Sequence, residues 1–285
     1  MLSWRDGNRF AIGGTSFRAV PDEAAESDEL LAIAQRVQDD LGDDEFFVFK
    51  FRAEIDAYAE LLDRLQPLHI FELGIHSGGS SILFAELTRP EKLVAVDLEP
   101  MPDVRERIEA RASASGLGDA VRAFGGVDQG DRAELARIAA GEFGDAGLDF
   151  VVDDCSHLYE PTRESFNELF PRLRAGGVYV IEDWRWGHTP LGQEARADWE
   201  PEVPLSRLVV EIVLASATVP GLASDIAVEP NGVTITRGDA DVDADTFDVS
   251  TLAERPAAAP SKTPMGPKTA RSRRAGSRWF PRRSG

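Results

Sequence analysis

Two acidic groups, each at the end of a short apolar run, are the residues of this sequence best suited to chemistry. Asp153-Asp154 follows one run, and Glu182-Asp183 follows another. Converging carboxylates repel one another strongly unless a cation neutralises them. A hard divalent cation with oxygen ligands does this, and Mg²⁺ with retained waters is the natural choice. The chain has one cysteine and four histidines in total, which argues against zinc.

A histidine accompanies the first acidic group. His157 lies three residues after Asp154, so its imidazole can stand beside a substrate held by the cation. A neutral histidine placed there can remove the proton of a hydroxyl group whose pKa the cation has lowered. A lone histidine in a loop is more often a capping or hydrogen-bonded residue. The position after two aspartates and opposite Glu182-Asp183 favours catalysis.

A glycine-rich turn follows an earlier apolar run, with FELGIHSGGSS at 71–81. Glycines there let the chain turn sharply and bring backbone N–H groups to the positive end of the next helix. His76 stands where the dinucleotide fingerprint G-x-G-x-x-G needs its second glycine, which disfavours a dehydrogenase. The spacing E-x-G-x-x-x-G is instead the one found in S-adenosylmethionine-dependent methyltransferases. The candidate residues for that ligand are Glu72, Gly74, Gly78 and Ser80, and the alternative is a turn with no ligand.

Two further positions favour a nucleoside. Asp97 lies 23 residues after Gly74, at the end of the next apolar run. A carboxylate there accepts hydrogen bonds from both ribose hydroxyls. Asp128 or Gln129, after the third run, can reach the adenine amino group.

These residues must be positioned by a regular scaffold, and from residue 69 short apolar runs alternate with helical patterns. That alternation is typical of βα units and a mostly parallel sheet. The predicted strands are 69–73, 93–97, 120–124, 148–153 and 177–182, and the predicted helices are 79–88, 102–116, 131–141, 161–174 and 204–216. Two more strands, 223–229 and 232–237, join at Asn231-Gly232, a strong hairpin signal. An α/β sheet that is mostly parallel and ends in an antiparallel hairpin points to the Rossmann-like class I methyltransferase fold.

The two ends of the chain differ from this pattern. Residues 1–27 are expected to form an irregular leader, followed by helices at 28–39 and 52–65; the phenylalanines between these helices are expected to dock the helical extension onto the main body. Beyond residue 254 the chain is rich in Pro, Ala, Ser and Arg without periodicity, which predicts a disordered tail. The expected division is 1–66 for the leader and helices, 67–240 for the S-adenosylmethionine-binding domain, and 241–285 for an acidic linker and the basic tail.

The composition excludes several classes of protein. Of the 285 residues, 42% are hydrophobic, enough for a real core, and the formal net charge is −19. Nine of the 31 Lys and Arg lie at 255–285, so the rest of the chain is strongly acidic and would repel nucleic acid and anionic membranes. No apolar run is long enough to span a bilayer, and the N-terminus does not look like a secretory signal. A reducing, cytoplasmic setting is the expected localisation.

The sequence FELGIHSGGSS, followed by FGGVDQGD and VVDDCSHLYEPTRESFNELFPRLRAGGVYVIEDW, resembles the metal-dependent sugar O-methyltransferases of macrolide biosynthesis. These include the macrocin and mycinamicin enzymes, and cephalosporin hydroxylase-like proteins share the pattern. The resemblance covers about residues 50–190. It implies Mg²⁺ ligands at Asp154, Glu182 and Asp183, with His157 as the base. Cys155 replaces the glycine usual in the D-D-G-S-H motif, and the segment after Asp183 departs from the family pattern, which leaves the acceptor open.

The leading hypothesis is therefore an S-adenosylmethionine- and Mg²⁺-dependent O-methyltransferase that acts on a hydroxyl of a sugar or secondary metabolite. One alternative is a catechol-type phenol O-methyltransferase, which uses similar metal chemistry. Another is a non-catalytic nucleoside-binding scaffold or regulatory module. The expected partner is a small-molecule hydroxyl acceptor, and the helical leader is a candidate for contacts in a homo-oligomer or for packing within the chain.

Overall fold

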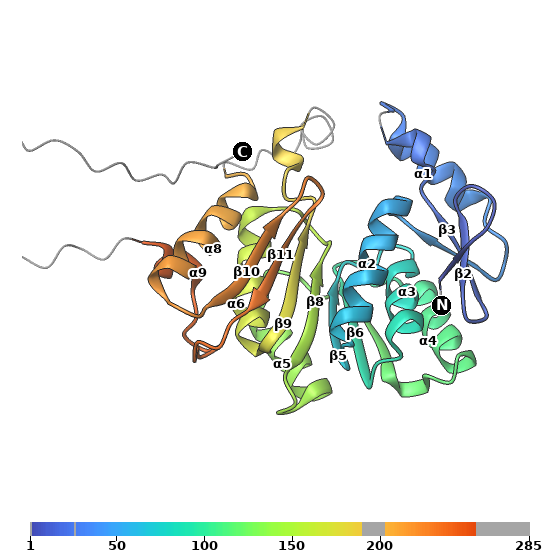
Figure 1. Ribbon diagram of the computed structural model, residues 1–285. Coiled ribbons are helices and arrows are strands. Elements are labelled where there is room, and N and C mark those ends of the chain that lie inside the picture. Colours follow the sequence, from blue (N-terminus) through green and yellow to red (C-terminus); the bar gives the residue numbers. More distant parts are fainter. Residues whose placement is uncertain (1, 26, 190–202, 255–285) are drawn as a thin grey trace, which may run out of the picture. The chain divides into compact units, whose positions relative to one another are not determined.

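A seven-stranded sheet forms the centre of the computed structural model, which describes residues 2–25, 27–189 and 203–254 (Figure 1). The strand order is β10-β11-β9-β8-β5-β6-β7. The strands are β5 (His69–Leu73), β6 (Lys92–Asp97), β7 (Val121–Gly125), β8 (Leu148–Asp153), β9 (Leu173–Glu182), β10 (Ala223–Val228) and β11 (Gly232–Arg237). Strands β5 to β9 are parallel, whereas β11 is antiparallel to both β9 and β10. The predicted class I methyltransferase sheet with its C-terminal hairpin is confirmed.

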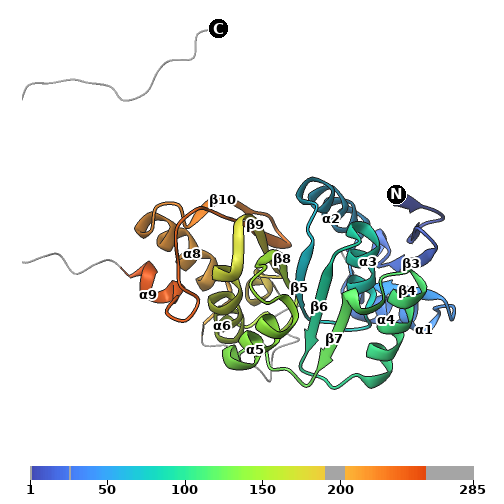
Figure 2. The same cartoon turned by 90° about the horizontal axis from the view of Figure 1, so that it is seen from below.

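Helices cover both faces of this sheet (Figures 1 and 2). They are α2 (Arg52–Leu65), α3 (Gly79–Thr88), α4 (Pro102–Ala114), α5 (Arg132–Phe143), α6 (Tyr159–Leu169), α8 (Ser206–Thr218) and α9 (Val249–Ala253). Side chains alternate along each strand, so Phe71 and Leu73 pack in the core with α5, α6 and α8, while Ile70 packs in the core with α2, α3 and α4. Because both faces of the central strands are buried, β5, β6 and β8 are almost continuously apolar.

Local sequence signals explain where several helices begin. The Asp131 side chain accepts a 3.0 Å hydrogen bond from the backbone N–H of Glu134 and so caps α5. Pro102 occupies the first turn of α4, where its missing N–H costs nothing. Single 3₁₀ turns lie at Asp22–Ala24, Gly118–Ala120, Phe170–Arg172 and Trp186–His188.

The N-terminal leader is not irregular, so that prediction was wrong. A four-stranded sheet forms here from β1 (Ser3–Trp4), β2 (Arg9–Ile12), β3 (Thr15–Ala19) and β4 (Glu45–Val48), with α1 (Leu30–Asp39) inserted before β4. Gly13-Gly14 is the turn of the β2–β3 hairpin, with Gly13 at a φ of +58°, rather than a break in structure. Phe46 and Val48 of β4 pack in the core with α2 and α3, so the docking role predicted for these phenylalanines holds for Phe46.

A second difference concerns the helix predicted at 161–174. Helix α6 ends at Leu169, a 3₁₀ turn containing Pro171 follows, and β9 begins at Leu173. Proline has no backbone N–H and its ring clashes with the preceding turn, so it ends the helix early.

The described residues up to Glu254 form one compact unit. The boundaries expected after residues 66 and 240 stay predictions, and the basic tail from 255 onward lies outside the described residues. Among the described residues, the structure contains no helix with the length and apolar character needed to cross a membrane.

Candidate active site

The two acidic groups meet because their strands are neighbours. Strand β8 ends at Asp153 and β9 ends at Glu182, and the strands pair in parallel with Asp153 opposite Ile181. The next residues, Asp154 and Asp183, therefore emerge at the same edge of the sheet, where ligands of open α/β sheets bind. The backbone N–H of Asp154 also donates a 2.9 Å hydrogen bond to the carbonyl of Leu73, which ties this edge to the end of β5.

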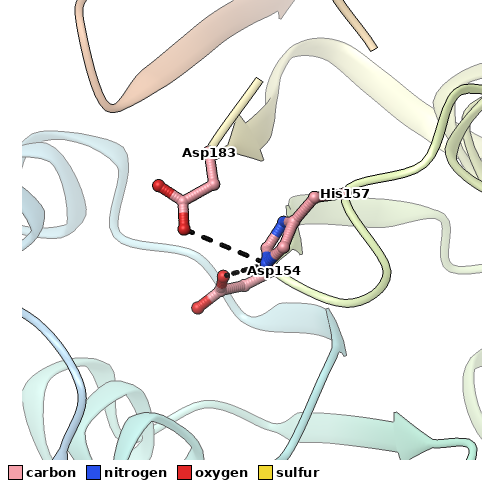
Figure 3. Close-up of side chains that lie close together, drawn as sticks. All are labelled: Asp154, His157 and Asp183. Atoms are coloured by element: carbon pink, nitrogen blue, oxygen red, sulfur yellow. Dashed lines mark ion pairs between the residues drawn. The ribbon is translucent and has the colours of Figure 1, made fainter. Parts of the chain in front are cut away.

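Asp154, His157 and Asp183 form a compact group of metal-ligating side chains (Figure 3). The His157 Nε2 lies 3.9 Å from Asp154 Oδ1 and 3.9 Å from Asp183 Oδ2. One donor atom from each residue lies within 4.8 Å of the others. His157 and Asp183 both adopt positive φ values, 54° and 51°, which cost about 1–3 kcal/mol each in non-glycine residues. Such strain persists where the surroundings over-determine the conformation.

Glu182 lies in a drier part of the same cluster. Its Oε2 is 2.5 Å from the Lys50 Nζ, and its Oε1 accepts a 2.5 Å hydrogen bond from the Tyr58 hydroxyl. The same Lys50 ammonium lies 2.8 Å from Asp154 Oδ2. Lys50 is only 4% exposed. Burial by itself would lower the pKa of Lys50, but the charges of Asp154 and Glu182 outweigh burial and raise it, so this lysine is an ammonium.

The charges of the cluster favour a further cation. Among the described residues, the Lys50 ammonium forms ion pairs with Asp154 and Glu182, and its charge also acts on Asp183. Burial and the charge of Asp154 raise the pKa of Asp183 to about 7, and the same two causes raise the pKa of Glu182. A divalent cation bound between these carboxylates would offset both their burial and their mutual repulsion. Oxygen donors with one imidazole suit Mg²⁺ or Mn²⁺, so the residues present fit the expected metal.

The glycine-rich turn lies directly against this cluster. Gly74 has a φ of +95°, and a Cβ atom added there would stand 2.2 Å from the carbonyl oxygen of Asp154. Gly78, the N-cap residue of α3, has a φ of +82°. A Cβ atom on Gly79 would stand 1.7 Å from the carbonyl oxygen of Phe47, to which the Ser77 hydroxyl also donates a hydrogen bond of 3.1 Å. The turn is thus held by backbone contact with β4 on one side and with Asp154 on the other.

Two predicted cofactor residues support the turn. The buried Glu72 accepts a 2.5 Å hydrogen bond from the Ser81 hydroxyl, and burial raises its pKa to about 7, opposed by hydrogen bonds from Ser80 and Ser81. Asp97 accepts hydrogen bonds from the backbone N–H groups of Ile75, at 2.8 Å, and His76, at 3.2 Å. These contacts place Asp97 beside the turn, at the carboxyl end of β6.

The structure separates Asp128 from Gln129. Asp128 is exposed, whereas Gln129 is 3% exposed and directed into the protein. The Gln129 Nε2 donates hydrogen bonds of 2.7 and 2.8 Å to the two oxygens of Asp153, and its Oε1 accepts one of 3.2 Å from the backbone N–H of Ser156. In this position Gln129 anchors the loop that carries Asp154 and His157, and Asp128 is the better placed of the two for a ligand.

Gln129→Ala is therefore expected to weaken the fold around the site. Asp153 is buried, and burial raises its pKa to about 6 although hydrogen bonds from Ser165, Tyr179 and Gln129 oppose the rise. Loss of the amide should lower the free energy of unfolding by about 1–3 kcal/mol, because a buried acceptor loses a partner. Urea unfolding followed by circular dichroism measures this, and an unchanged midpoint would contradict the anchoring role.

Two tryptophans follow Asp183 and contact different parts of the protein. The Trp186 ring centroid is 5.1 Å from that of His157. Trp184 instead helps to line a surface pocket of about 550 Å³ with Val203, Pro204 and residues of α8. His188 is exposed and its Nε2 lies 2.7 Å from the Ser206 hydroxyl.

Cys155, the residue after Asp154, is a poor nucleophile. Burial and the charges of Asp153 and Asp97 raise the pKa of its thiol.

Lys50 and Tyr58 are the site residues that sequence reasoning missed. Both precede the predicted methyltransferase domain, and they lie 132 and 124 residues before Glu182. Tyr58 lies within the helix predicted at 52–65. The one available signal was that Lys50 is among only four lysines in the chain.

Comparisons with known proteins agree with this fold and motif pattern. Residues 71–184 match the model of a family described as "Methyltransferase domain". The demethylmacrocin O-methyltransferase of Streptomyces fradiae is 50% identical over 56 residues, which cover 20% of this chain and 13% of the relative. The mycinamicin VI 2''-O-methyltransferase of Micromonospora griseorubida is 46% identical over 63 residues, which cover 22% of this chain and 15% of the relative. The predicted resemblance to macrolide sugar O-methyltransferases is confirmed.

A solved structure supports the same fold. The methyltransferase MycE of the mycinamycin biosynthetic pathway, in complex with Mg and SAH, has a TM-score of 0.50 and 23% identity, covering 72% of this chain and 53% of MycE. The strand order of the central sheet is that of the class I methyltransferase fold, and residues 71–184 of this sheet and its helices match the family model. The matched stretch spans well under a fifth of the length of the two curated relatives.

Proposed function

We propose that this chain is an S-adenosylmethionine- and Mg²⁺-dependent O-methyltransferase that acts on a hydroxyl group of a sugar in a small-molecule natural product. The observation that carries the proposal is the contact between the glycine turn and the cation cluster. Gly74, at the turn, lies against the backbone of Asp154, whose side chain belongs to the cluster with His157 and Asp183. The methyl donor and the acceptor would therefore be bound next to each other.

The named relatives support the choice of acceptor. The demethylmacrocin and mycinamicin enzymes are O-methyltransferases, and a tetracenomycin relative from Streptomyces olivaceus that is 42% identical over 74 residues methylates a rhamnosyl 2'-hydroxyl by its name. All three similarities are local. A sugar offers hydroxyl oxygens to a hard cation and to hydrogen-bond donors, which suits a cluster built of carboxylates and an imidazole.

The residues of the chain have separate tasks in this proposal. Asp154, Glu182 and Asp183 would hold the divalent cation, which when bound would lower the pKa of the acceptor hydroxyl. The His157 imidazole accepts the hydroxyl proton as the new O–C bond forms and the C–S bond of the methyl donor breaks. The turn at Gly74 and the carboxylate of Asp97 fix the donor. Most of the rate enhancement then comes from positioning the two reactants within about 3–3.5 Å of each other.

His157→Gln is expected to lower the transfer rate by about 10²-fold, in line with the loss of a positioned general base. Transfer rates at saturating substrates, compared with those of the wild type, test this. A rate equal to that of the wild type would show that His157 is not the base.

Calorimetry with S-adenosylmethionine, with and without Mg²⁺, is the first experiment. A panel of glycosylated macrolides and catechols then tests the acceptor. Transfer to sugars supports the proposal, and transfer to catechols alone would favour the phenol O-methyltransferase. Donor binding without transfer to any acceptor would favour a nucleoside-binding module, and absence of donor binding would refute all three.

A further inference from the structure

We propose that Trp186 is a positioning residue whose indole N–H holds the carboxylate of Asp183 in place for the divalent cation, with the indole ring packed against His157. The inference rests on the cation site of the proposed function. The sequence resemblance does not imply it, because Trp186 lies in the segment after Asp183 that departs from the family pattern.

The short turn that carries Trp186 is tied to Asp183 by its backbone. The backbone N–H of Trp186 donates a 3.0 Å hydrogen bond to the carbonyl of Asp183. The Trp186 carbonyl accepts two more hydrogen bonds, from the backbone N–H of Thr189 at 3.0 Å and from the Thr189 hydroxyl at 3.1 Å. Because its backbone is bonded on both sides, the Trp186 side chain starts from a fixed point next to the cation group.

The Trp186 side chain contacts two members of the cation group in different ways. Its indole N–H, the only hydrogen-bond donor of a tryptophan side chain, donates to the Asp183 carboxylate. Its ring centroid lies 5.1 Å from that of His157, with 41° between the two ring planes. Asp183 Oδ2 and His157 Nε2 are themselves 3.9 Å apart (Figure 3). The contact with His157 therefore fixes the indole where its N–H faces the carboxylate.

The neighbouring Trp184 shows the structural role that Trp186 does not have. Trp184 packs against the core cluster that includes Leu208 of α8, and its indole N–H donates a 2.8 Å hydrogen bond to the carbonyl of Glu229. Trp186 is half-buried and belongs to none of the hydrophobic core clusters formed by the described residues. Core packing therefore does not account for Trp186, whereas its contacts with Asp183 and His157 do.

Asp183 needs such support because of its conformation and exposure. Its φ is +51° and its side chain is 35% exposed. A carboxylate at the open edge of a sheet turns toward solvent unless a neighbouring donor holds it. Hydrogen bonds that orient a metal ligand in this way are important for binding, and their loss typically costs about 10–100-fold in metal affinity or activity.

The test is Mn²⁺ binding to the full chain, measured by electron paramagnetic resonance without donor or acceptor. Trp186→Phe keeps a ring beside His157 but removes the N–H that Asp183 accepts, so Mn²⁺ affinity should fall by about tenfold or more. Trp4→Phe is the matched control. Trp4 is also half-buried, and its indole N–H donates a 2.7 Å hydrogen bond to Asp56, which does not belong to the cation group. The control should bind Mn²⁺ within about twofold of the wild type, since distant sites act independently.

A double variant tests whether Trp186 acts through Asp183. Asp183→Asn alone should weaken Mn²⁺ binding, and adding Trp186→Phe to it should weaken binding further by less than about threefold, because both changes remove the same contact. Fully additive losses would mean that Trp186 affects the ion by another route, and they would overturn the inference.

Melting temperatures show whether each variant is folded. If Trp186→Phe does not fold, 3-benzothienylalanine at position 186 replaces the indole N–H by sulfur and keeps the shape of the ring, and the same loss of Mn²⁺ affinity is expected. Wild-type Mn²⁺ affinity in the folded variant, or a loss of the same size in Trp4→Phe, would overturn the inference alone. Absence of Mn²⁺ binding in the wild type would overturn it together with the cation site. The expected binding pattern without any methyl transfer would refute only the proposed function.

Discussion

Asp154→Asn is expected to lower methyl transfer about 10³-fold or more while it changes the affinity for S-adenosylmethionine only slightly. Asp154 contributes one oxygen to the group with His157 and Asp183, and its other oxygen lies on Lys50 at 2.8 Å. The amide keeps the size of the side chain but removes the charge that holds the cation. A catalytic metal stabilises charge in the transition state by several kcal/mol, and each 1.36 kcal/mol corresponds to a factor of ten in rate.

The measurement has two parts. Single-turnover transfer rates with and without a chelator report the chemical step, and calorimetry reports donor binding. Asp145→Asn is the matched control, because Asp145 is an exposed residue just after α5. Loss of donor binding in Asp154→Asn would mean that the fold of the turn had failed, and full activity of the variant in chelator would remove the metal from the mechanism.

The central sheet could be predicted because its signals are local and repeated. Each parallel strand is a short apolar run, each is followed by a helical pattern, and the hairpin is marked by Asn231-Gly232, so the strands and the fold class could be predicted. The N-terminal sheet was missed for the opposite reason. Its strands are only two to five residues long. A Gly-Gly pair such as Gly13-Gly14 is compatible with a hairpin turn and also with a break in a helix, so the sequence does not distinguish the two.

The candidate site was predictable only where strands end. Asp154, His157 and Asp183 follow two neighbouring strands, so topology alone brings them together. Lys50 reaches the same cluster from a loop after β4, across 104 residues of sequence to Asp154. No periodicity or spacing links residues that far apart, and a single buried lysine looks in sequence like any surface lysine.

Gln129 shows another limit of sequence reasoning. Its chemistry suits adenine and suits the buried Asp153 equally, since an amide donates and accepts hydrogen bonds in both cases. Only burial separates the two roles. The Gln129 side chain is 3% exposed and donates a hydrogen bond to Asp153. The positive φ of His157 and Asp183 likewise has no sequence signal, because both residue types usually adopt negative values.

Gly74→Ala is expected to damage both the fold and the catalytic site. The φ of +95° at Gly74 is unfavourable for any residue with a side chain, and the added Cβ would stand 2.2 Å from the carbonyl oxygen and 2.7 Å from the carbonyl carbon of Asp154. These are backbone atoms, so either the turn or the strand end must move. We expect the free energy of unfolding to fall by about 3 kcal/mol or more, combining backbone strain with overpacking.

Gly126→Ala separates these two causes. Gly126 also has a positive φ, +78°, but a Cβ atom there would meet nothing within 4 Å. It should lose only about 1 kcal/mol, the cost of the backbone conformation. Urea unfolding of both variants gives the difference, and donor calorimetry should show a loss of S-adenosylmethionine affinity in Gly74→Ala alone. Equal loss of unfolding free energy in the two variants would mean that the close approach of Gly74 to Asp154 contributes nothing to stability. The backbone contact would then no longer explain why the donor and the cation are bound side by side.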